Sequence, residues 1–288
     1  MSTSNHLTGR RISAAPSRGV SESVRHGVRA SVFVRRVVLW GSAVTSAALA
    51  SPLMAINGEI LRQEVNGGKG YVVMRVWGSH HDMGYAHAWL LHGEIVSVVA
   101  QAKALFGSDN YALARLIVGS NTVWKPDPIE AELDGMVEAL AVLEPGAGID
   151  KIDLKVINVV SDLGYWPTLC RSHSCWGHFV ADPIKTISTR RLDFGTPVPM
   201  ANFHVLCVWL PTDGSPGWAN LACPGYVVAA TAVNEFGTQA SLHDYNSSSG
   251  TPYTPWLPRS VAARFALTLV RDADIATHAD TVYSRLQN

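Results

Sequence analysis

The chain has 288 residues, of which 47% are hydrophobic and 16% are charged. These proportions are typical of an ordinary folded protein, and they exclude a disordered, collagenous or coiled-coil chain. The 23 basic and 23 acidic side chains balance, whereas a dedicated nucleic-acid-binding protein normally carries a basic excess. We therefore expect no nucleic-acid partner.

The charges are unevenly distributed along the chain. Residues 1–36 contain seven Arg and a single acidic residue, whereas residues 37–288 contain 16 basic and 22 acidic residues. The sequence is thus a basic leader joined to a mildly acidic body, and the overall balance conceals this division.

The leader ends in an apolar stretch, residues 37–50, which follows Arg35-Arg36 and closes with Ala48-Leu49-Ala50. The stretch has the length of a signal-peptide core and is short for a membrane span. We expect residues 1–50 to direct export to the periplasm or the extracellular space, and no stable membrane span in the mature chain. A disordered extension or a mitochondrial presequence has a similar composition, so a cytoplasmic or organellar location stays open.

The first half of the body is predicted to be mainly helical. Residues 61–75 indicate one or two short strands around a glycine-rich turn, and residues 85–105 indicate a helix with a broad apolar face. A second helix is expected to begin at Asp127 and to end at Pro145, because apolar residues recur between them at helical spacing. A third helix is expected at residues 154–162.

From Cys175 onwards the sequence is typical of strands separated by turns. The runs 205–210 and 226–230 are apolar throughout, which indicates strands covered on both faces. The order of elements predicts a layered α+β domain. The expected strands are residues 176–181, 186–194, 204–210, 226–233 and 238–244, and the expected C-terminal helices are residues 260–271 and 274–286.

Several motifs that would indicate a metal or a cofactor are absent. The sequence contains no phosphate-binding loop, no dinucleotide-binding fingerprint and no His-Glu-x-x-His. The histidines between residues 80 and 92 are spaced five, six and seven residues apart, which does not align two ligands on one helix face. We therefore expect neither a metal site nor a cofactor.

The pattern that points to chemistry begins at Cys175. A turn at Asp182-Pro183 is predicted to send a returning strand back, so that Arg190 and Asp193 lie beside the cysteine. An arginine near a thiol favours the thiolate, and an aspartate can hold an amine in place. The same residues also fit a structural role, with Cys175 as a small buried side chain and the other two as an ion pair.

The run from Cys175 to Arg190-Arg191-Leu192-Asp193-Phe194 resembles the start of the catalytic chain of N-terminal-nucleophile amide hydrolases. The chain is most similar to the acyl-coenzyme A:6-aminopenicillanic acid acyltransferase-like peptidases, and choloylglycine hydrolases and acid ceramidase are more distant relatives. Further stretches that resemble this family are residues 78–87, 224–226, 232–237 and 258–264.

The resemblance implies a four-layer αββα sandwich and a self-processing cysteine amide hydrolase or acyltransferase that acts on a small N-acyl amide. The precursor would be cut between Ser174 and Cys175, and the new α-amino group would act as the base for the thiol. By position in the motif, Arg190 would lie beside the sulfur and Asp193 would hold the amine. His243 falls where relatives place an oxyanion-hole or substrate-contact residue. Asn234 is the other candidate for such a contact, although it also fits a turn-shaping role.

The resemblance also implies a division of the body into a helical pro-segment or α-chain, residues 51–174, and a strand-rich catalytic β-chain, residues 175–288, which stay associated after the cut. Only 114 residues run from Cys175 to the last residue, whereas relatives continue with further strands that supply an oxyanion-stabilising Asn. The sandwich is therefore expected to be incomplete at the C-terminus. The alternative functions are a catalytically incomplete fold that binds an acylated ligand, and a hydrolase of lipid amides or phospholipids.

Overall fold

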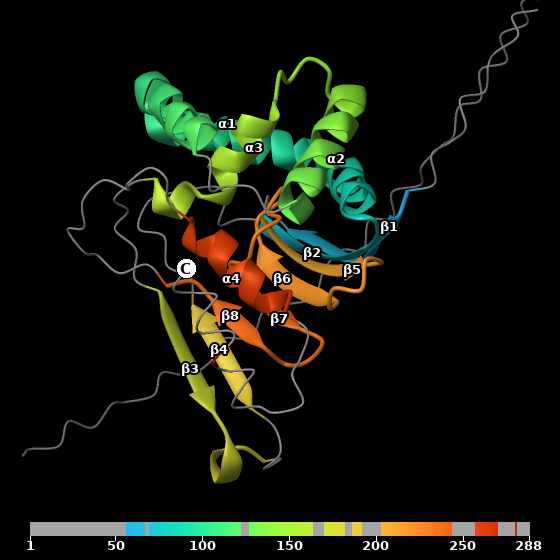
Figure 1. Cartoon of the computed structure of the whole chain (residues 1–288), viewed down its shortest axis with the longest axis vertical. Coiled ribbons are helices and arrows are strands. Elements are labelled where there is room, and N and C mark those ends of the chain that lie inside the picture. Colours follow the sequence, from blue (N-terminus) through green and yellow to red (C-terminus); the bar gives the residue numbers. More distant parts are fainter. Residues whose placement is uncertain are drawn as a thin grey trace, which may run out of the picture. The chain divides into compact units, whose positions relative to one another are not determined.

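The computed structural model describes residues 56–66, 69–121, 127–163, 170–181, 186–191, 203–243, 257–269 and 280. The chain divides into two units, Met1–Pro52 and Leu53–Asn288, and all described residues belong to the second. The elements of this unit, in chain order (Figure 1), are β1 (Gly58–Asn66), β2 (Lys69–Gly78), α1 (His80–Ser120), α2 (Asp127–Leu143), α3 (Lys151–Asn158), η1 (Val160–Asp162), β3 (Arg171–Cys175), η2 (Gly177–Phe179), β4 (Ile187–Arg191), β5 (Phe203–Pro211), β6 (Trp218–Ala222), β7 (Thr231–Asn234), β8 (Gln239–Ser241) and α4 (Arg259–Leu267). The predicted α+β class is confirmed.

The described strands form a six-stranded sheet in the order β1-β2-β5-β6-β7-β8 and a separate two-stranded sheet of β3 and β4. Neighbours in the larger sheet are antiparallel except β2 and β5, which are parallel. A parallel pair needs a crossover connection, and α1, α2 and α3 all lie in the chain between β2 and β5.

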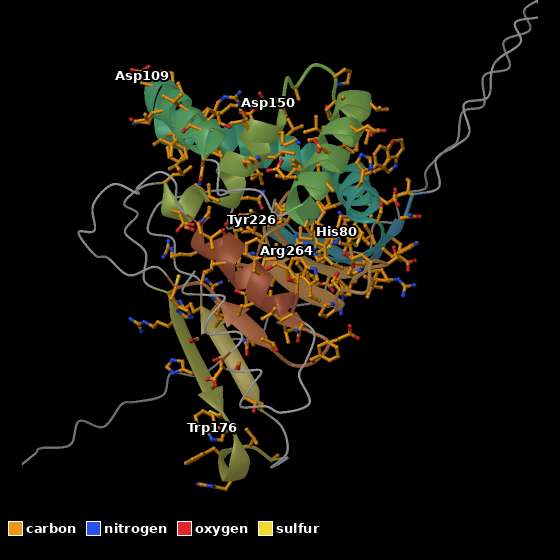
Figure 2. The ribbon with its side chains drawn as sticks, in the orientation of Figure 1. His80, Asp109, Asp150, Trp176, Tyr226 and Arg264 are labelled. Atoms are coloured by element: carbon orange, nitrogen blue, oxygen red, sulfur yellow. The ribbon has the colours of Figure 1, made fainter. Side chains whose placement is uncertain are left out.

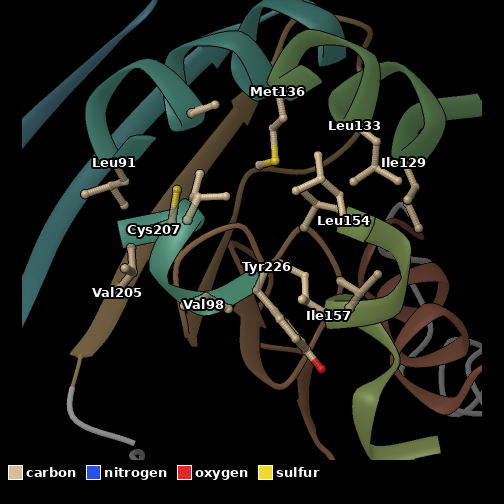
Figure 3. Close-up of a cluster of buried hydrophobic side chains, with 14 of the residues drawn as sticks. Leu91, Val98, Ile129, Leu133, Met136, Leu154, Ile157, Val205, Cys207 and Tyr226 are labelled. Atoms are coloured by element: carbon tan, nitrogen blue, oxygen red, sulfur yellow. The ribbon is translucent and has the colours of Figure 1, made fainter. Parts of the chain in front are cut away.

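One face of the six-stranded sheet packs against helices. The register pairs Val72 with Val205 and Met74 with Cys207, so these buried side chains share a face. Helices α1, α2 and α3 lie together over this face, and α4 lies along β7 and β8 (Figure 1). Figure 3 shows the core that results, in which α2 contributes Ile129, Leu133 and Met136.

Helix α1 begins where the sequence supplies a cap. The Ser79 side chain accepts a hydrogen bond from the backbone N–H of Asp82, and the Asp82 carboxylate accepts one in return from the backbone N–H of Ser79. This capping box satisfies two otherwise unpaired donors of the first turn. The helix extends well beyond the predicted residues 85–105 and is interrupted at Leu91 and at Gly107, whose φ is +71°.

Helices α1 and α2 touch backbone to backbone. A Cβ atom at Gly84 would overlap the carbonyl oxygen of Glu132, and a Cβ atom at Gly135 would overlap that of His81. Glycine at both positions therefore sets the distance between the two helices, and it brings polar residues of α1 close to those of α2.

The other face of the sheet exposes an apolar strip across β5, β6 and β7, beside the exposed Arg75 of β2 and His204 of β5. Leu206 and Leu210 of β5, Leu221 of β6 and Val233 of β7 all point to this side and are exposed. The prediction that residues 205–210 are covered on both faces is therefore wrong. The side chains alternate between a buried and an exposed face, and an uninterrupted apolar run does not reveal this alternation.

Several predicted boundaries also differ from the structure. Residues 226–230 form a buried irregular segment instead of a strand, β6 was not predicted, and α3 begins at Lys151 instead of residue 154. The strand expected at residues 176–181 is replaced by the short helix η2, and the strand expected at 186–194 is described as β4. The helix expected at residues 274–286 lies outside the described ranges except for residue 280.

Candidate functional site

The candidate nucleophile lies on the hairpin of β3 and β4. The hairpin register pairs Cys175 with Ile187, and the thiol-bearing residue is exposed. Cys175 was expected to open a strand, but it is the last residue of β3. The chain turns directly after it because Gly177 has a φ of +60°, which a glycine adopts without steric cost.

The bond expected to be cut, between Ser174 and Cys175, is therefore part of a continuous, exposed strand. The Ser174 hydroxyl lies 2.8 Å from the Ser188 hydroxyl on the neighbouring strand. The scissile position is thus held in extended conformation by a ladder that continues on both sides of Ser174.

Arg190 is on the same hairpin but is not beside Cys175. It pairs with Ser172 in the ladder, and its guanidinium donates to the Thr231 hydroxyl and to the Leu242 carbonyl oxygen. A third contact, at 3.9 Å, joins the guanidinium to the sulfur of Cys170. The thiol that the structure brings to Arg190 is thus Cys170, five residues before the expected nucleophile.

Three predicted site residues remain, namely Asp193, His243 and Asn234. Asp193 lies outside the described residues. His243 is exposed and follows Leu242, whose carbonyl oxygen binds Arg190, so His243 and Arg190 lie in the same part of the molecule. Asn234 is buried, and its amide oxygen accepts the backbone N–H groups of Phe236 and Thr238. These are the hydrogen bonds of a turn-shaping side chain.

The segment that leads to Thr231 is held by buried polar side chains that are not among the predicted site residues. Residues 224–229 are buried without forming a strand, so their backbone groups need partners from elsewhere. His87 accepts the Gly225 N–H at 3.1 Å, Asn158 binds the Gly225 carbonyl and the Val227 N–H, and Asn220 binds the Val228 carbonyl. Each of these side chains comes from a different element, namely α1, α3 and β6.

A buried ion pair completes this network. Arg264 of α4 binds both carboxylate oxygens of Glu132 of α2 at 2.5 Å, and it also donates to the Val227 carbonyl. Both side chains are almost fully buried, and the guanidinium carbon lies 4.5 Å from the ring centre of Trp218. The bidentate geometry and the aromatic contact suit arginine better than lysine. Figure 2 shows Arg264 beneath the helices, close to His80.

His80 joins Glu132 to the β5–β6 turn. Its Nδ1 lies 2.7 Å from a Glu132 oxygen and its Nε2 lies 3.0 Å from an Asp213 oxygen. Burial and the nearby Arg264 charge lower the pKa of His80, but the hydrogen bond and charge of Glu132, together with the hydrogen bond to Asp213, outweigh them and raise that pKa. The Ser215 hydroxyl and then its backbone N–H, with a smaller contribution from His80, hold the pKa of Asp213 at about 2.

One histidine and two thiols near the sheet are held in their neutral forms. Burial lowers the pKa of His87 to about 4, so its ring is neutral at neutral pH. Because Nε2 accepts a hydrogen bond, the proton is on Nδ1, which has no partner among the described residues. Burial also raises the pKa of Cys223 to about 12 and that of Cys207 well above its ordinary value. Both thiols are free and protonated.

Comparison with known protein families finds no match, and a comparison with curated proteins finds no match either. Among the described residues, no helix is both long enough and apolar enough to cross a bilayer. Within the same part of the chain, no group of three or more His, Cys, Asp or Glu side chains is arranged to hold a metal ion.

A charged residue inside an apolar helix face is the signal that could have revealed the buried network. Glu132 interrupts the apolar series Ile129, Leu133 and Met136 of α2, and Arg264 lies between alanines and apolar residues of α4. Charged side chains are almost never fully buried unless they are paired. Two such interruptions of opposite charge therefore indicate a buried ion pair.

Proposed function

We propose that the chain is a self-processing cysteine amide hydrolase or acyltransferase with Cys175 as its nucleophile. The observation that carries this proposal is the accessibility of the thiol. Of the four cysteines, Cys175 is exposed, Cys170 and Cys223 are half-buried and Cys207 is buried. A nucleophile has to reach both a scissile carbonyl and a substrate, and Cys175 is the thiol that solvent reaches most freely.

The first step would be self-cleavage. The Cys175 thiol attacks the carbonyl carbon of Ser174, the peptide nitrogen leaves as the α-amine of Cys175, and a thioester forms. Water then hydrolyses the thioester, which releases the Ser174 carboxylate and restores the thiol. The product is a new N-terminal cysteine that carries its own amine, and the ordinary pKa of an α-amino group is about 7.7–8.0.

In the second step the amine serves as the general base for the adjacent thiol. The thiolate attacks the carbonyl carbon of a small N-acyl amide, the amine portion leaves, and the acyl-enzyme passes its acyl group to water or to another amine. Arg190 would stabilise the thiolate and Asp193 would orient the α-amine. His243 would contact the oxyanion or the substrate, because it adjoins the residue that binds Arg190, and no metal or cofactor is required.

The cut itself would allow these residues to meet. In the uncut strand the ladder pairs Arg190 with Ser172 and fixes Cys175 opposite Ile187. Cleavage would separate Cys175 from the residues that precede it in β3. The new N-terminus could then move along β4 towards Arg190.

We also propose that the complete fold is a four-layer αββα sandwich, and the exposed apolar strip of the six-stranded sheet supports this. Helices cover one face of the sheet. The other face carries exposed leucines and a valine on β5, β6 and β7. Sheets of a sandwich bury such faces against each other. A second sheet, to which β3 and β4 would belong, is the layer that this face requires.

The six-stranded sheet also supports the proposal that the two product chains stay associated. Strands β1 and β2 precede the cut, whereas β5 to β8 follow it, and β2 pairs with β5 along nine residues. The proposed α-chain (residues 51–174) and β-chain (residues 175–288) would therefore share one sheet and one core. Export, directed by residues 37–50, is proposed to bring this protein to the periplasm or the extracellular space.

The test of self-processing is a denaturing gel of the purified chain, with N-terminal sequencing of the smaller band. We expect two bands, of which one begins at Cys175. The Cys175→Ala variant should remain uncut, whereas Cys170→Ala, which removes the thiol directly before β3, should be cut like the wild type. A single band for the wild type, unchanged by Cys175→Ala, would contradict the proposal.

The test of the second step is hydrolysis of a panel of N-acyl amides and esters by the processed protein. Release of free amine that is lost with Cys175→Ala supports an amidase. A preference for lipid amides or phospholipids over short acyl amides would favour the lipid hydrolase of the same fold.

A catalytically incomplete binding protein is the second candidate, and one observation favours it. Arg190 uses its guanidinium for Thr231 and Leu242, at a distance of three ladder positions from Cys175. This candidate predicts an uncut chain whose melting temperature rises when an N-acyl amide is added. An uncut chain that no member of the panel stabilises would eliminate it.

A further inference from the structure

The end of the β3–β4 hairpin exposes large apolar side chains close together in the chain. Trp176, Phe179 and Ile187 are 63%, 74% and 55% exposed, and Figure 2 shows Trp176 at the far end of the hairpin. Single exposed apolar residues are normal on a soluble protein, but a cluster of them marks an interaction site. Leu113 and Leu116 of α1 and Val142 of α2 are similarly exposed, but none of them is aromatic.

The strands behind this apolar end are polar and basic. Arg171 and His173 are exposed on β3, and no Asp or Glu occurs among residues 170–181 and 186–191. Residues 170–181 and 186–191 contain three Arg and no Lys. The hairpin is therefore cationic, although the body of the chain carries more acidic than basic residues.

We propose that the end of this hairpin docks on an anionic lipid surface. Tryptophan is enriched at the boundary between headgroups and acyl chains, and basic side chains behind an inserted apolar group meet the lipid phosphates. Trp176, Phe179 and Ile187 enter this boundary, while Arg171 and Arg191, which are paired in the ladder and exposed, remain at the headgroup level. This docking does not depend on Cys175 being a nucleophile.

The charge and chemistry of the hairpin favour a lipid surface over two other partners. A symmetric contact between two copies would bring two cationic hairpins together, which like-charge repulsion disfavours. A single-stranded nucleic acid would use the aromatic rings as stacking platforms, but the aliphatic Ile187 belongs to the same exposed end and offers no ring face.

The experiment uses the full chain with Cys170→Ala and Cys175→Ala, which cannot cut itself and has no reactive thiol on the hairpin. Cys207 and Cys223 remain, and burial raises the pKa of both thiols. A single new cysteine, Ile187→Cys, carries a polarity-sensitive fluorophore. The matched control places the same fluorophore on α1 through Leu116→Cys. Each protein is mixed with phosphatidylcholine vesicles that contain or lack phosphatidylserine.

We expect a blue-shifted, brighter emission from position 187 with phosphatidylserine vesicles and no change from position 116. Adding Trp176→Ser and Phe179→Ser should weaken the response at position 187 by about tenfold or more, because binding scales with buried apolar area. The fluorophore reports on the hairpin directly, so vesicle binding through the basic leader leaves it unchanged.

Three results would overturn the proposal. The first is an unchanged emission from position 187 at every vesicle concentration. The second is the same shift on raising the protein concentration without vesicles, which would indicate self-association. The third is a shift with single-stranded DNA but not with vesicles. Self-cleavage is measured separately on the wild-type chain, so failure of the docking and failure of the proposed enzyme are distinguishable.

Discussion

The buried segment 224–229 and the β3–β4 hairpin differ in what binds their backbone N–H and C=O groups. The buried segment has no strand partner, and side chains from four elements satisfy its polar groups. The hairpin has a regular ladder, but its residues are exposed or half-buried, and two strands alone are marginally stable. Tertiary contacts therefore fix the irregular segment more firmly than the regular one, and the candidate nucleophile lies in the part that has more freedom to move.

Removing one partner of the buried ion pair should have the largest effect on stability. Glu132→Gln leaves the Arg264 charge buried without its carboxylate, which costs about 3–5 kcal/mol. The free energy of unfolding in urea measures this loss. The control is Arg75→Gln on β2, whose ion pair with Glu59 is about half-exposed on both sides and contributes at most about 1 kcal/mol. Equal losses of unfolding free energy in the two variants would show that the buried ion pair stabilises the fold no more than a surface ion pair does.

The contact between α1 and α2 should be the next most sensitive feature. Gly84→Ala puts a methyl group against the Glu132 carbonyl oxygen, and this overlap should lower the free energy of unfolding by about 1–3 kcal/mol. Gly93→Ala on the same helix meets no atom within 4 Å. It should raise the stability slightly, by about 0.5–1 kcal/mol, because alanine is the better helix former. A Gly84→Ala protein as stable as the wild type would show that α1 and α2 can move apart without any loss of unfolding free energy.

The bridge from Glu132 through His80 to Asp213 should make stability depend on pH. The pKa of His80 is raised in the folded state, so its contribution is complete below its unfolded pKa of about 6.5 and is lost as the pH rises through the folded value. Asp213 acts in the opposite direction, because its folded pKa is about 2. Its contribution is present above an unfolded pKa of about 3.9 and is lost as the pH falls towards 2.

The measurement is the difference in unfolding free energy between the wild type and His80→Gln. We expect a larger difference at pH ~5.5 than at pH ~9. His87 is present in both proteins, so its own titration cancels. If the difference in unfolding free energy between the two proteins grew with pH, the pKa of His80 would not be raised in the folded state.

Substitutions on the hairpin should have the smallest effect. Thr189→Ala removes an exposed side chain of β4 and should change the free energy of unfolding by no more than about 0.5 kcal/mol. Hydrogen exchange provides the sharper comparison. The amides of β3 and β4 should exchange through local opening, whereas those of β5 should require nearly global unfolding. Equal protection of the two strand pairs would show that the hairpin is part of the core.

The elements that the sequence predicts well are those defined by local pattern. The apolar period of residues 129–140 locates α2, because every third or fourth residue meets the same core. The glycine-rich sequence near residue 67 marks where β1 ends and β2 begins. Cap chemistry at Ser79 was also readable in principle, since Asp82 follows at the spacing of a capping box.

The features that were missed depend on contacts between distant residues. The run 226–230 has the composition of a buried strand, but its backbone partners are His87, Asn158 and Arg264, which are far away in the chain. Periodicity does not distinguish such a segment from a strand. The register of the hairpin is similarly hidden, because a shift of a few residues decides whether Arg190 lies opposite Ser172 or near Cys175.

The parallel pairing of β2 with β5 has a consequence for how a processed protein would unfold. In the sequence β2 precedes the Ser174–Cys175 bond and β5 follows it. A cut at this bond therefore turns a unimolecular folding reaction into the association of two separate chains. The melting temperature of the cut protein would then rise with protein concentration, as it does for obligate dimers. Once separated, the fragments would have to find each other to refold, so the uncut precursor is the form in which this sheet assembles most readily.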